Sequence, residues 1–245
     1  MPIIYLSPST QEFNPYISGG NEEQYMNLIA DAMEPYLAAS GIQFVRNTPE
    51  MTAATSIAAS NSGNYDFHLA LHSNASGGTA GSVRGSEVYY SPSSRLGQKA
   101  ATIFADNLRL IYPLPARVKT VPTTTLGEVN RTRAPAVLIE FAYHDNYEDA
   151  EWIKNNIDSI AQNVVLSLTE YFGIPFNMPQ DILVGTINNP NSTGANLYSF
   201  PNESSAVKRW VPNGSEVVSY NRGEVWSVVG FQDDVGYVRT NYVVF

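Results

Sequence analysis

Three side chains that can bind a metal or carry a proton stand at the ends of predicted elements: Glu22, His72 and Glu140. His72 ends the strand-like segment 66–72, Glu140 lies near the end of the apolar segment 135–142, and Glu22 begins a predicted helix. Ligands in open α/β sheets bind at the carboxyl ends of the strands, so these residues could converge at one sheet edge. Two ligands and a separate carboxylate base suit a zinc hydrolase, in which zinc activates water and polarises a carbonyl.

Structural roles compete with these chemical ones. His68 shares a strand face with His72, and their Cα atoms should lie roughly 13 Å apart, so one ion cannot take both. We therefore expect His68 to be packed or hydrogen-bonded. An acid in a strand as apolar as that of Glu140 needs a partner to ionise, and Arg131 or Arg133 could supply a buried salt bridge instead of a catalytic role.

The acids at the start of the predicted helix 22–39 differ in position. Asn21 is the expected N-cap, with Gln24 as its capping-box partner. The helix dipole favours both acids at this terminus, which accounts well for Glu23 on the flank. Glu22 lies on the buried stripe, where an inward carboxylate needs a specific partner.

The pattern along the chain predicts two domains. Strands are expected at 3–6, 42–45, 66–72, 86–91 and 135–142, with helices at 22–39, about 50–60, 94–111 and about 147–172. This alternation predicts an α/β domain at 1–174, with a mostly parallel sheet covered by helices on both faces. After a proline-containing linker at 175–182, short strands and turns predict a small all-β barrel at 183–245.

Composition excludes several functions. The chain has 23 acidic against 14 basic residues and no cysteine, which argues against nucleic-acid binding and rules out a thiol nucleophile. No apolar run is long enough to span a bilayer, and the N-terminus lacks the pattern of a signal peptide. Synthesis in the cytoplasm, followed by export or lysis through another route, is therefore expected. No G-x-S-x-G, Walker or G-x-G-x-x-G motif is present.

Residues 1–173 resemble the zinc-dependent N-acetylmuramoyl-L-alanine amidases, in the branch of clostridial cell-wall hydrolases and phage endolysins. The matching stretches are "LSPSTQEFNPY", "NEEQYMNLIAD", "YDFHLALHSNA", "GSEVYY" and "RAPAVLIEFAYHDN". The resemblance implies cleavage of the amide between the lactyl group of N-acetylmuramic acid and L-alanine of the stem peptide. It makes Glu22 and His72 zinc ligands, and Glu140 the catalytic glutamate that takes a proton from the attacking water and passes it to the leaving amine. Asn74 and Arg133 are candidate substrate contacts.

One departure from the family pattern concerns the first zinc ligand, a histidine in the loop after the first strand. Aligning "SPSTQEFNPY" on that loop puts Phe13 at this position, and a phenyl ring cannot bind zinc. Zinc could be held weakly by Glu22, His72 and another group such as His144, or water could fill the vacancy. Alternatively, hydrolysis is lost or weakened and wall binding is kept. If Phe13 leaves one zinc-ligand position empty, Phe13→His should raise the zinc content of the protein.

Residues 183–245 resemble bacterial SH3-like domains, which commonly follow wall hydrolases and bind peptidoglycan. The stretches that carry this resemblance are "NLYSFPNESSAVKRWVPNGSEV", "VWSVV" and "GYVRTNYV". Tyr198, Trp210, Trp226 and Tyr237 are candidate wall contacts, although aromatic residues in a small barrel usually belong to its core. The leading hypothesis is thus a peptidoglycan amidase acting in the cell wall or outside the cell. A wall-binding protein on an amidase scaffold and a zinc peptidase acting on stem peptides are the alternatives.

Overall fold

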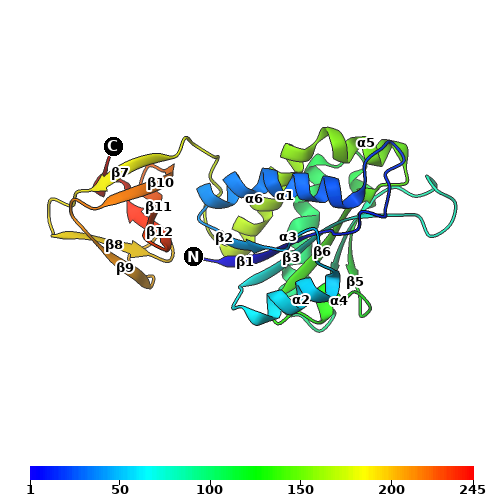
Figure 1. The fold of residues 1–245 in the computed structure, drawn as a ribbon, viewed down its shortest axis with the longest axis horizontal. Helices are drawn as coiled ribbons and strands as arrows, with labels where there is room; N and C mark the ends of the chain where they lie inside the picture. Colours follow the sequence, from blue (N-terminus) through cyan, green and yellow to red (C-terminus); the bar gives the residue numbers. More distant parts are fainter. The chain divides into compact units, whose positions relative to one another are not determined.

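The computed structural model describes all residues, 1–245. Contacts divide the chain into two units. One comprises Ile3–Glu34 and Phe44–Tyr171, and the other comprises Met1–Pro2, Pro35–Gln43 and Phe172–Phe245. The first unit carries an α/β sheet with helices, and the second carries an all-β sheet (Figure 1). None of the helices combines the length and the apolar character that crossing a membrane requires.

The α/β sheet has six strands in the order β2-β1-β3-β6-β4-β5. Their bounds are β1 Ile3–Pro8, β2 Gln43–Arg46, β3 Phe67–Asn74, β4 Ser86–Tyr90, β5 Val118–Pro122 and β6 Ala136–Tyr143. The pairs β1–β3, β3–β6 and β4–β5 are parallel, whereas β4 runs antiparallel to β6. The sheet is therefore mixed, with one antiparallel junction in an otherwise parallel arrangement.

Helices cover this sheet on both faces. They are α1 Glu22–Ala39, α2 Ala53–Ser62, α3 Arg95–Ile111, α4 Gly127–Asn130, α5 Tyr147–Asn155 and α6 Ile157–Phe172. Helices α1, α5 and α6 lie on one side of the sheet, and α2 and α4 on the other (Figure 1). Helix α3 joins the first group, because its Phe104 stacks on Phe67 of β3 with ring centroids 6.2 Å apart.

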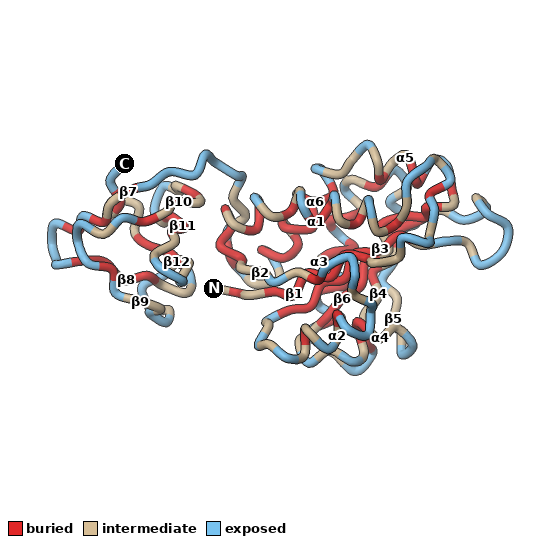
Figure 2. Tube along the Cα trace, in the orientation of Figure 1, coloured by how far each residue is buried: buried red, intermediate tan, exposed pale blue.

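The two faces of the sheet differ in chemistry. Strands β3 and β6 run through the buried interior of this unit (Figure 2). One face of the sheet is apolar and fully buried around Leu69 and Leu71 of β3 and Val137 and Ile139 of β6. On the other face the parallel register pairs His68 with Ala136, Ala70 with Leu138, and His72 with Glu140. The opposite face therefore begins as a small apolar patch under α4 and becomes polar towards the carboxyl ends of the strands.

Most predicted elements are present, with three differences. The single helix expected at about 147–172 is two helices, because the chain leaves helical geometry at Asn156. The structure also has β5 and α4, which the sequence did not predict. Strand β5 is largely exposed and α4 is only four residues long, so neither carries enough apolar periodicity to be recognised.

Helix α1 begins as predicted, and its start positions Glu22. The Gln24 backbone N–H donates to Oδ1 of Asn21 over 2.8 Å, which satisfies one of the unpaired amides of the first turn. Glu22 is 1% exposed, whereas Glu23 is only partly buried. The cap therefore fixes the turn from which an inward carboxylate projects.

Replacement of Asn21 by alanine should cost about 1 kcal/mol of stability, because the capping acceptor is lost. For a domain of this size we expect the unfolding temperature to fall by about 2–4 °C. Differential scanning calorimetry measures the shift, with Asn21→Asp as the control because aspartate also caps helices. An equal loss in both variants would show that the cap does not stabilise α1.

The second unit contains seven strands in the order β13-β7-β10-β11-β12-β8-β9. They are β7 Leu183–Ile187, β8 Gly194–Tyr198, β9 Val207–Pro212, β10 Glu216–Arg222, β11 Trp226–Phe231, β12 Asp234–Arg239 and β13 Val243–Val244. Neighbouring strands are antiparallel, around a core that includes Ile187, Leu197 and Val229. Strands β13 and β9 are edges, so the expected closed barrel is not found. Strand patterns predict a run of short strands but not whether the first and last strands pair.

Candidate active site

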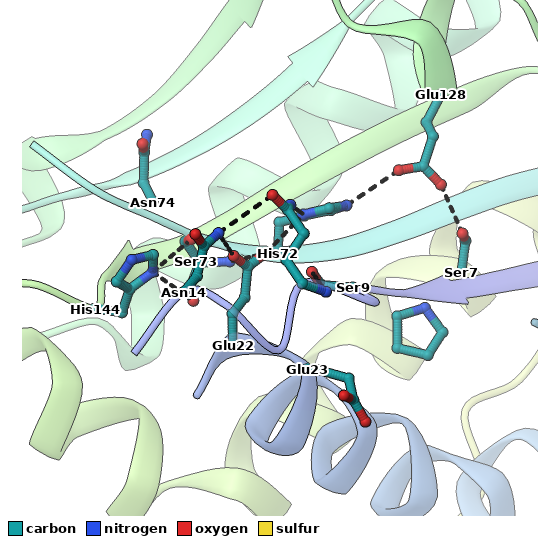
Figure 3. Close-up of polar contacts among 12 residues, drawn as sticks. Ser7, Ser9, Asn14, Glu22, Glu23, His72, Ser73, Asn74, Glu128 and His144 are labelled. Atoms are coloured by element: carbon teal, nitrogen blue, oxygen red, sulfur yellow. Dashed lines mark hydrogen bonds and ion pairs between the residues drawn. The ribbon is translucent and has the colours of Figure 1, made fainter. Parts of the chain in front are cut away.

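A buried histidine held between two carboxylates forms the centre of the site. His72 lies at the carboxyl end of β3, with its Nδ1 2.8 Å from Oε1 of Glu22. Its Nε2 lies 3.1 Å from Oε2 of Glu128. Figure 3 shows these side chains, which come from α1, β3 and α4. The structure thus brings Glu22 and His72 together as predicted and adds Glu128, which was not predicted.

Hydrogen bonds keep the first carboxylate charged although it is buried. Nδ2 of Asn14 donates to Oε2 of Glu22 over 2.6 Å, so Oε1 is left to face His72. Burial raises the pKa of Glu22, but hydrogen bonds from His72 and Asn14 outweigh this and lower it. Burial likewise lowers the pKa of His72, but its bonds to Glu128 and Glu22 raise it well above its ordinary value.

Glu128 connects two histidines. Its Oε1 accepts a hydrogen bond from Oγ of Ser7 over 2.6 Å and lies 3.3 Å from Nε2 of His68. His68 is fully buried, and its Nδ1 lies 3.0 Å from Oγ of Ser60, so it is a hydrogen-bonded histidine as expected. Burial raises the pKa of Glu128, but its hydrogen bonds with His68 and His72 lower it strongly. The only sequence signal for this residue was an acid between apolar neighbours in "LGEV".

Glu140 lies beside His72, on the adjacent strand β6. The two are Cα partners in the β3–β6 register, and Glu87 of β4 is the partner of Glu140 on the other side. Glu140 is only partly buried as a whole, yet its Oε2 is buried and has no hydrogen-bond partner. Burial raises its pKa to about 8, with the neighbouring carboxylates adding to the effect and His72 opposing it. The salt-bridge alternative is therefore not realised.

Of the two predicted substrate contacts in this domain, Asn74 lies at this edge of the sheet and Arg133 does not. Asn74 ends β3, and its Nδ2 donates to Oε2 of Glu87 over 3.3 Å, beside Glu140. Arg133 precedes the amino end of β6, about 20 Å along the strand from Glu140, and its backbone N–H donates to Asn61. The prediction that Arg133 contacts substrate at this site is therefore not supported by its position.

Phe13 and His144 were the residues considered for the third ligand position, and the structure gives them different surroundings. The Phe13 side chain is 73% exposed. Nδ1 of His144 lies 2.8 Å from the backbone carbonyl oxygen of Ser73, which occupies that nitrogen. The loop residue that does approach is Gln11, whose side-chain Nε2 lies 3.3 Å from Nδ1 of His72.

The donor set fits a metal ion only in part. One imidazole nitrogen and one carboxylate oxygen face each other at 2.8 Å in a buried position, which suits a cation. However, no group of three or more His, Cys, Asp or Glu side chains is arranged to hold one. Glu22 and His72 would thus supply only two of the three protein ligands that catalytic zinc usually has.

A cavity of about 340 Å³ opens beside His72. Its lining includes Glu128 and His72 together with Gln11 and Phe13 from the β1–α1 loop. Most of the remaining lining side chains are small and polar: Ser7, Ser9, Thr10, Asn47, Thr52 and Ser56. The cavity surface is mainly apolar, with a few polar side chains that could fix the orientation of a ligand.

The aromatic residues predicted to contact the wall differ in exposure. Tyr237 is buried in the core of the second unit, whereas Trp210 on the edge strand β9 is 45% exposed. Tyr198 and Trp226 pack edge-to-face with ring centroids 5.7 Å apart. The guanidinium carbon of Arg239 lies 4.5 Å from the Trp226 ring centroid.

Comparison with known proteins agrees with this fold. Solved structures that superpose on about 70% of the chain include the amidase AmiC2 of Nostoc punctiforme (17% identity, 97% of that chain, TM-score 0.63). A second is the catalytic domain of the amidase CwlV from Bacillus (Paenibacillus) polymyxa (17% identity, 100% of that chain, TM-score 0.61). A third is the catalytic domain of the CD27L endolysin targeting Clostridia difficile (23% identity, 98% of that chain, TM-score 0.58). A search of curated proteins found no match. The family described as "N-acetylmuramoyl-L-alanine amidase" matches residues 12–170, and the chain belongs to this family.

Proposed function

We propose that this amidase hydrolyses the amide between the lactyl group of N-acetylmuramic acid and L-alanine, using Glu140 as its proton-transfer group. The observation that carries the proposal is the alignment of Glu140 with His72 across adjacent parallel strands, beside the Glu22–His72 pair. A carboxyl group with a pKa of about 8 can exchange protons near neutral pH, as a group that serves first as base and then as acid must.

Each residue has a distinct part in this mechanism. Glu22 and His72 would hold a divalent cation, for which zinc is the family's usual choice; such an ion polarises a carbonyl and activates water. Glu140 takes a proton from the attacking water and delivers it to the nitrogen of L-alanine as the C–N bond breaks. Glu128 holds the His72 ring from its far nitrogen, as outer carboxylates commonly do for ligating histidines.

The second unit is proposed to bind the wall. Its sequence resembles SH3-like domains, and the boundaries we propose are 1–174 for the amidase domain, 175–182 for the linker and 183–245 for this domain. The exposed ring of Trp210 on an edge strand and the Tyr198–Trp226 pair are its candidate contacts. The protein would act on peptidoglycan in the cell wall or after release, in the manner of an autolysin or endolysin.

Trp210→Ala should weaken sedimentation of the protein with purified cell walls several-fold, because a half-exposed indole is lost without opening the core. Val207→Ala, an exposed position on the same strand β9, is the matched control. Equal sedimentation of the two variants would remove Trp210 from the proposed contact surface.

The alternative is a wall-binding protein whose hydrolysis is weakened or lost. The observation that favours it is the missing third His, Cys, Asp or Glu ligand around Glu22 and His72. Such a protein would bind walls while leaving their amide bonds intact.

Product analysis of digested peptidoglycan tests the function. The amidase should release L-alanine amino termini and muramic acid with free lactyl carboxyl groups, in equal amounts and in the presence of added Zn²⁺ or Mn²⁺. New amino termini of other stem residues would indicate a peptidase. Wall binding without any new amino terminus would overturn the proposed hydrolysis and support the alternative.

A further inference from the structure

The order of the strands gives the two sides of the His72–Glu140 pair different surroundings. His72 on β3 and Glu140 on β6 are partners at the centre of the order β2-β1-β3-β6-β4-β5. Strand β1 therefore lies beside β3, and β4 lies beside β6. A substrate whose scissile amide lies at this pair extends towards both outer strands. The residues there show which half of the substrate each side can hold.

The cavity lies on the β1 side of His72. Ser7 and Pro8 of β1 line it, together with Phe13 of the following loop and Met51 just before α2. Its surface is mainly apolar, and the Phe13 ring is 73% exposed. Covering such a ring with an apolar face of a ligand is favourable. A sugar ring presents an apolar face through its C–H groups, and the acetyl and lactyl methyl groups of N-acetylmuramic acid are apolar as well.

The β4 side of Glu140 carries a second carboxyl group. Glu87 of β4 is the antiparallel partner of Glu140, so both side chains leave the same face of the sheet. Oε2 of Glu87 accepts hydrogen bonds from Oη of Tyr89 over 2.5 Å and from Nδ2 of Asn74 over 3.3 Å. None of the ion pairs in the chain includes Glu87 or Glu140. Glu87 is therefore a fixed acceptor that lacks a cationic partner.

The proposed reaction produces a cation at this place. When the C–N bond breaks, the nitrogen of L-alanine keeps its hydrogen and receives the proton that Glu140 took from water. The free amine then takes a further proton from solvent, because α-amino groups are largely protonated at neutral pH. The resulting ammonium group stands beside Glu140, and Glu87 supplies the carboxyl group of the neighbouring strand.

We propose that the substrate crosses this edge of the sheet in one direction, with its muramyl half in the cavity beside Phe13 and its peptide half over β4. In this arrangement Glu87 binds the amino group of L-alanine, and Phe13 packs against the sugar. The inference rests on the proposed function for the identity of the substrate. It adds the direction of binding and a residue for each half.

Binding of two fragments of the substrate to the full chain tests this direction. The fragments are L-alanine methylamide, which has a free amino group, and the amide of N-acetylmuramic acid. Dissociation constants are measured by NMR titration at pH 7 in EDTA. Glu87→Gln should weaken binding of L-alanine methylamide about ten-fold, because a hydrogen bond between two charged groups is lost. Phe13→Ala should weaken binding of the muramyl amide about five-fold, because apolar contact area is lost.

Each variant should leave the other fragment's dissociation constant unchanged within a factor of two. N-acetyl-L-alanine methylamide, which carries no charge, is the matched control ligand and should respond little to Glu87→Gln. Glu148→Gln, the same change at an exposed position in α5, is the matched control variant and should alter neither constant.

Backbone amide shifts of the wild type provide a second measurement that needs no variant. L-alanine methylamide should shift the signals of β4, residues 86–90. The muramyl amide should shift those of the loop at 9–13 and of residues 51–53. This mapping decides the matter if circular dichroism shows that Glu87→Gln does not fold.

Several outcomes would overturn the assignment. They are the opposite pattern of shifts, binding of both fragments on one side, binding of neither, or an unchanged affinity for L-alanine methylamide in folded Glu87→Gln. Product analysis of digested peptidoglycan is read separately. Fragments that map as expected on a protein that cleaves no peptidoglycan would refute the proposed hydrolysis and leave the direction standing. Amide cleavage together with the opposite mapping would refute the direction alone.

Discussion

Replacing Glu140 by glutamine is expected to reduce amide cleavage by at least about a thousand-fold while making the ion-free protein more stable at alkaline pH. General acid–base groups typically contribute 10²–10⁴-fold, and one that serves as both base and acid should lie in the upper part of this range. Glutamine keeps the shape of the side chain but carries no transferable proton. Release of L-alanine amino termini from peptidoglycan measures the loss. Glu23→Gln, the same change at a partly exposed position in α1, should retain activity.

The expected stabilisation depends on pH in a defined direction. The pKa of Glu140 is about 8 in the folded protein against 4.5 ordinarily, so the folded state binds more protons between these values. The stability that protonated Glu140 contributes is therefore present below about pH 4.5 and is lost as pH rises through 8. The full shift corresponds to about 5 kcal/mol, and since the residue is partly exposed we expect about 2–3 kcal/mol.

Thermal unfolding in EDTA measures this effect. Glu140→Gln should unfold about 5–10 °C above the wild type at pH 8.5 and at nearly the same temperature at pH 4.5. An equal difference at both pH values would show that packing, and not ionisation of Glu140, is responsible. Retention of cleavage by a folded Glu140→Gln protein would remove this residue from the mechanism.

The second large effect is expected at Glu128. Glu128→Gln replaces an acceptor of hydrogen bonds from His68 and His72 by an amide that presents a donor to one of them. Breaking a buried charged network of this kind typically costs about 3–5 kcal/mol, so the unfolding temperature should fall by about 10 °C. Because outer carboxylates orient ligating histidines, metal affinity and kcat should fall about 10–100-fold.

The readouts separate positioning from a general loss of structure. A change in the orientation of His72 should lower metal affinity and kcat in folded protein at 20 °C, with KM for wall fragments little affected. Glu148→Gln, an exposed acid in the first turn of α5, is the control and should change none of these quantities. Loss of stability with unchanged metal affinity would restrict Glu128 to a structural role.

The parts of the site that could be predicted are those on regular elements. The strand and helix patterns placed His72 and Glu140 at the carboxyl ends of their strands and Glu22 on the inner side of a capped helix. These three positions follow from alternation in strands and from the helical repeat. Parallel pairing of β3 with β6 then brings His72 and Glu140 together, which the order of elements alone does not specify.

The parts that could not be predicted come from short or irregular segments. Glu128 lies on a four-residue helix, where no periodicity shows which way a side chain points. Gln11 approaches His72 from the β1–α1 loop, whose path depends on the bonds of Asn14. Residue count along such a loop does not show which of its side chains approaches His72.

The separation of the β-sheet into an apolar and a polar face bears on how such a protein can diverge. Leu69, Leu71, Val137 and Ile139 are constrained by volume, because an error there opens a cavity or forces a clash. On the opposite face, at the carboxyl ends of the strands, the residues are constrained by hydrogen bonding, because each donor there needs a particular acceptor. A ligand can therefore be exchanged on the polar face while the packing that determines the fold is left intact. Such independence is consistent with a chain that keeps the amidase fold at 17% identity to AmiC2.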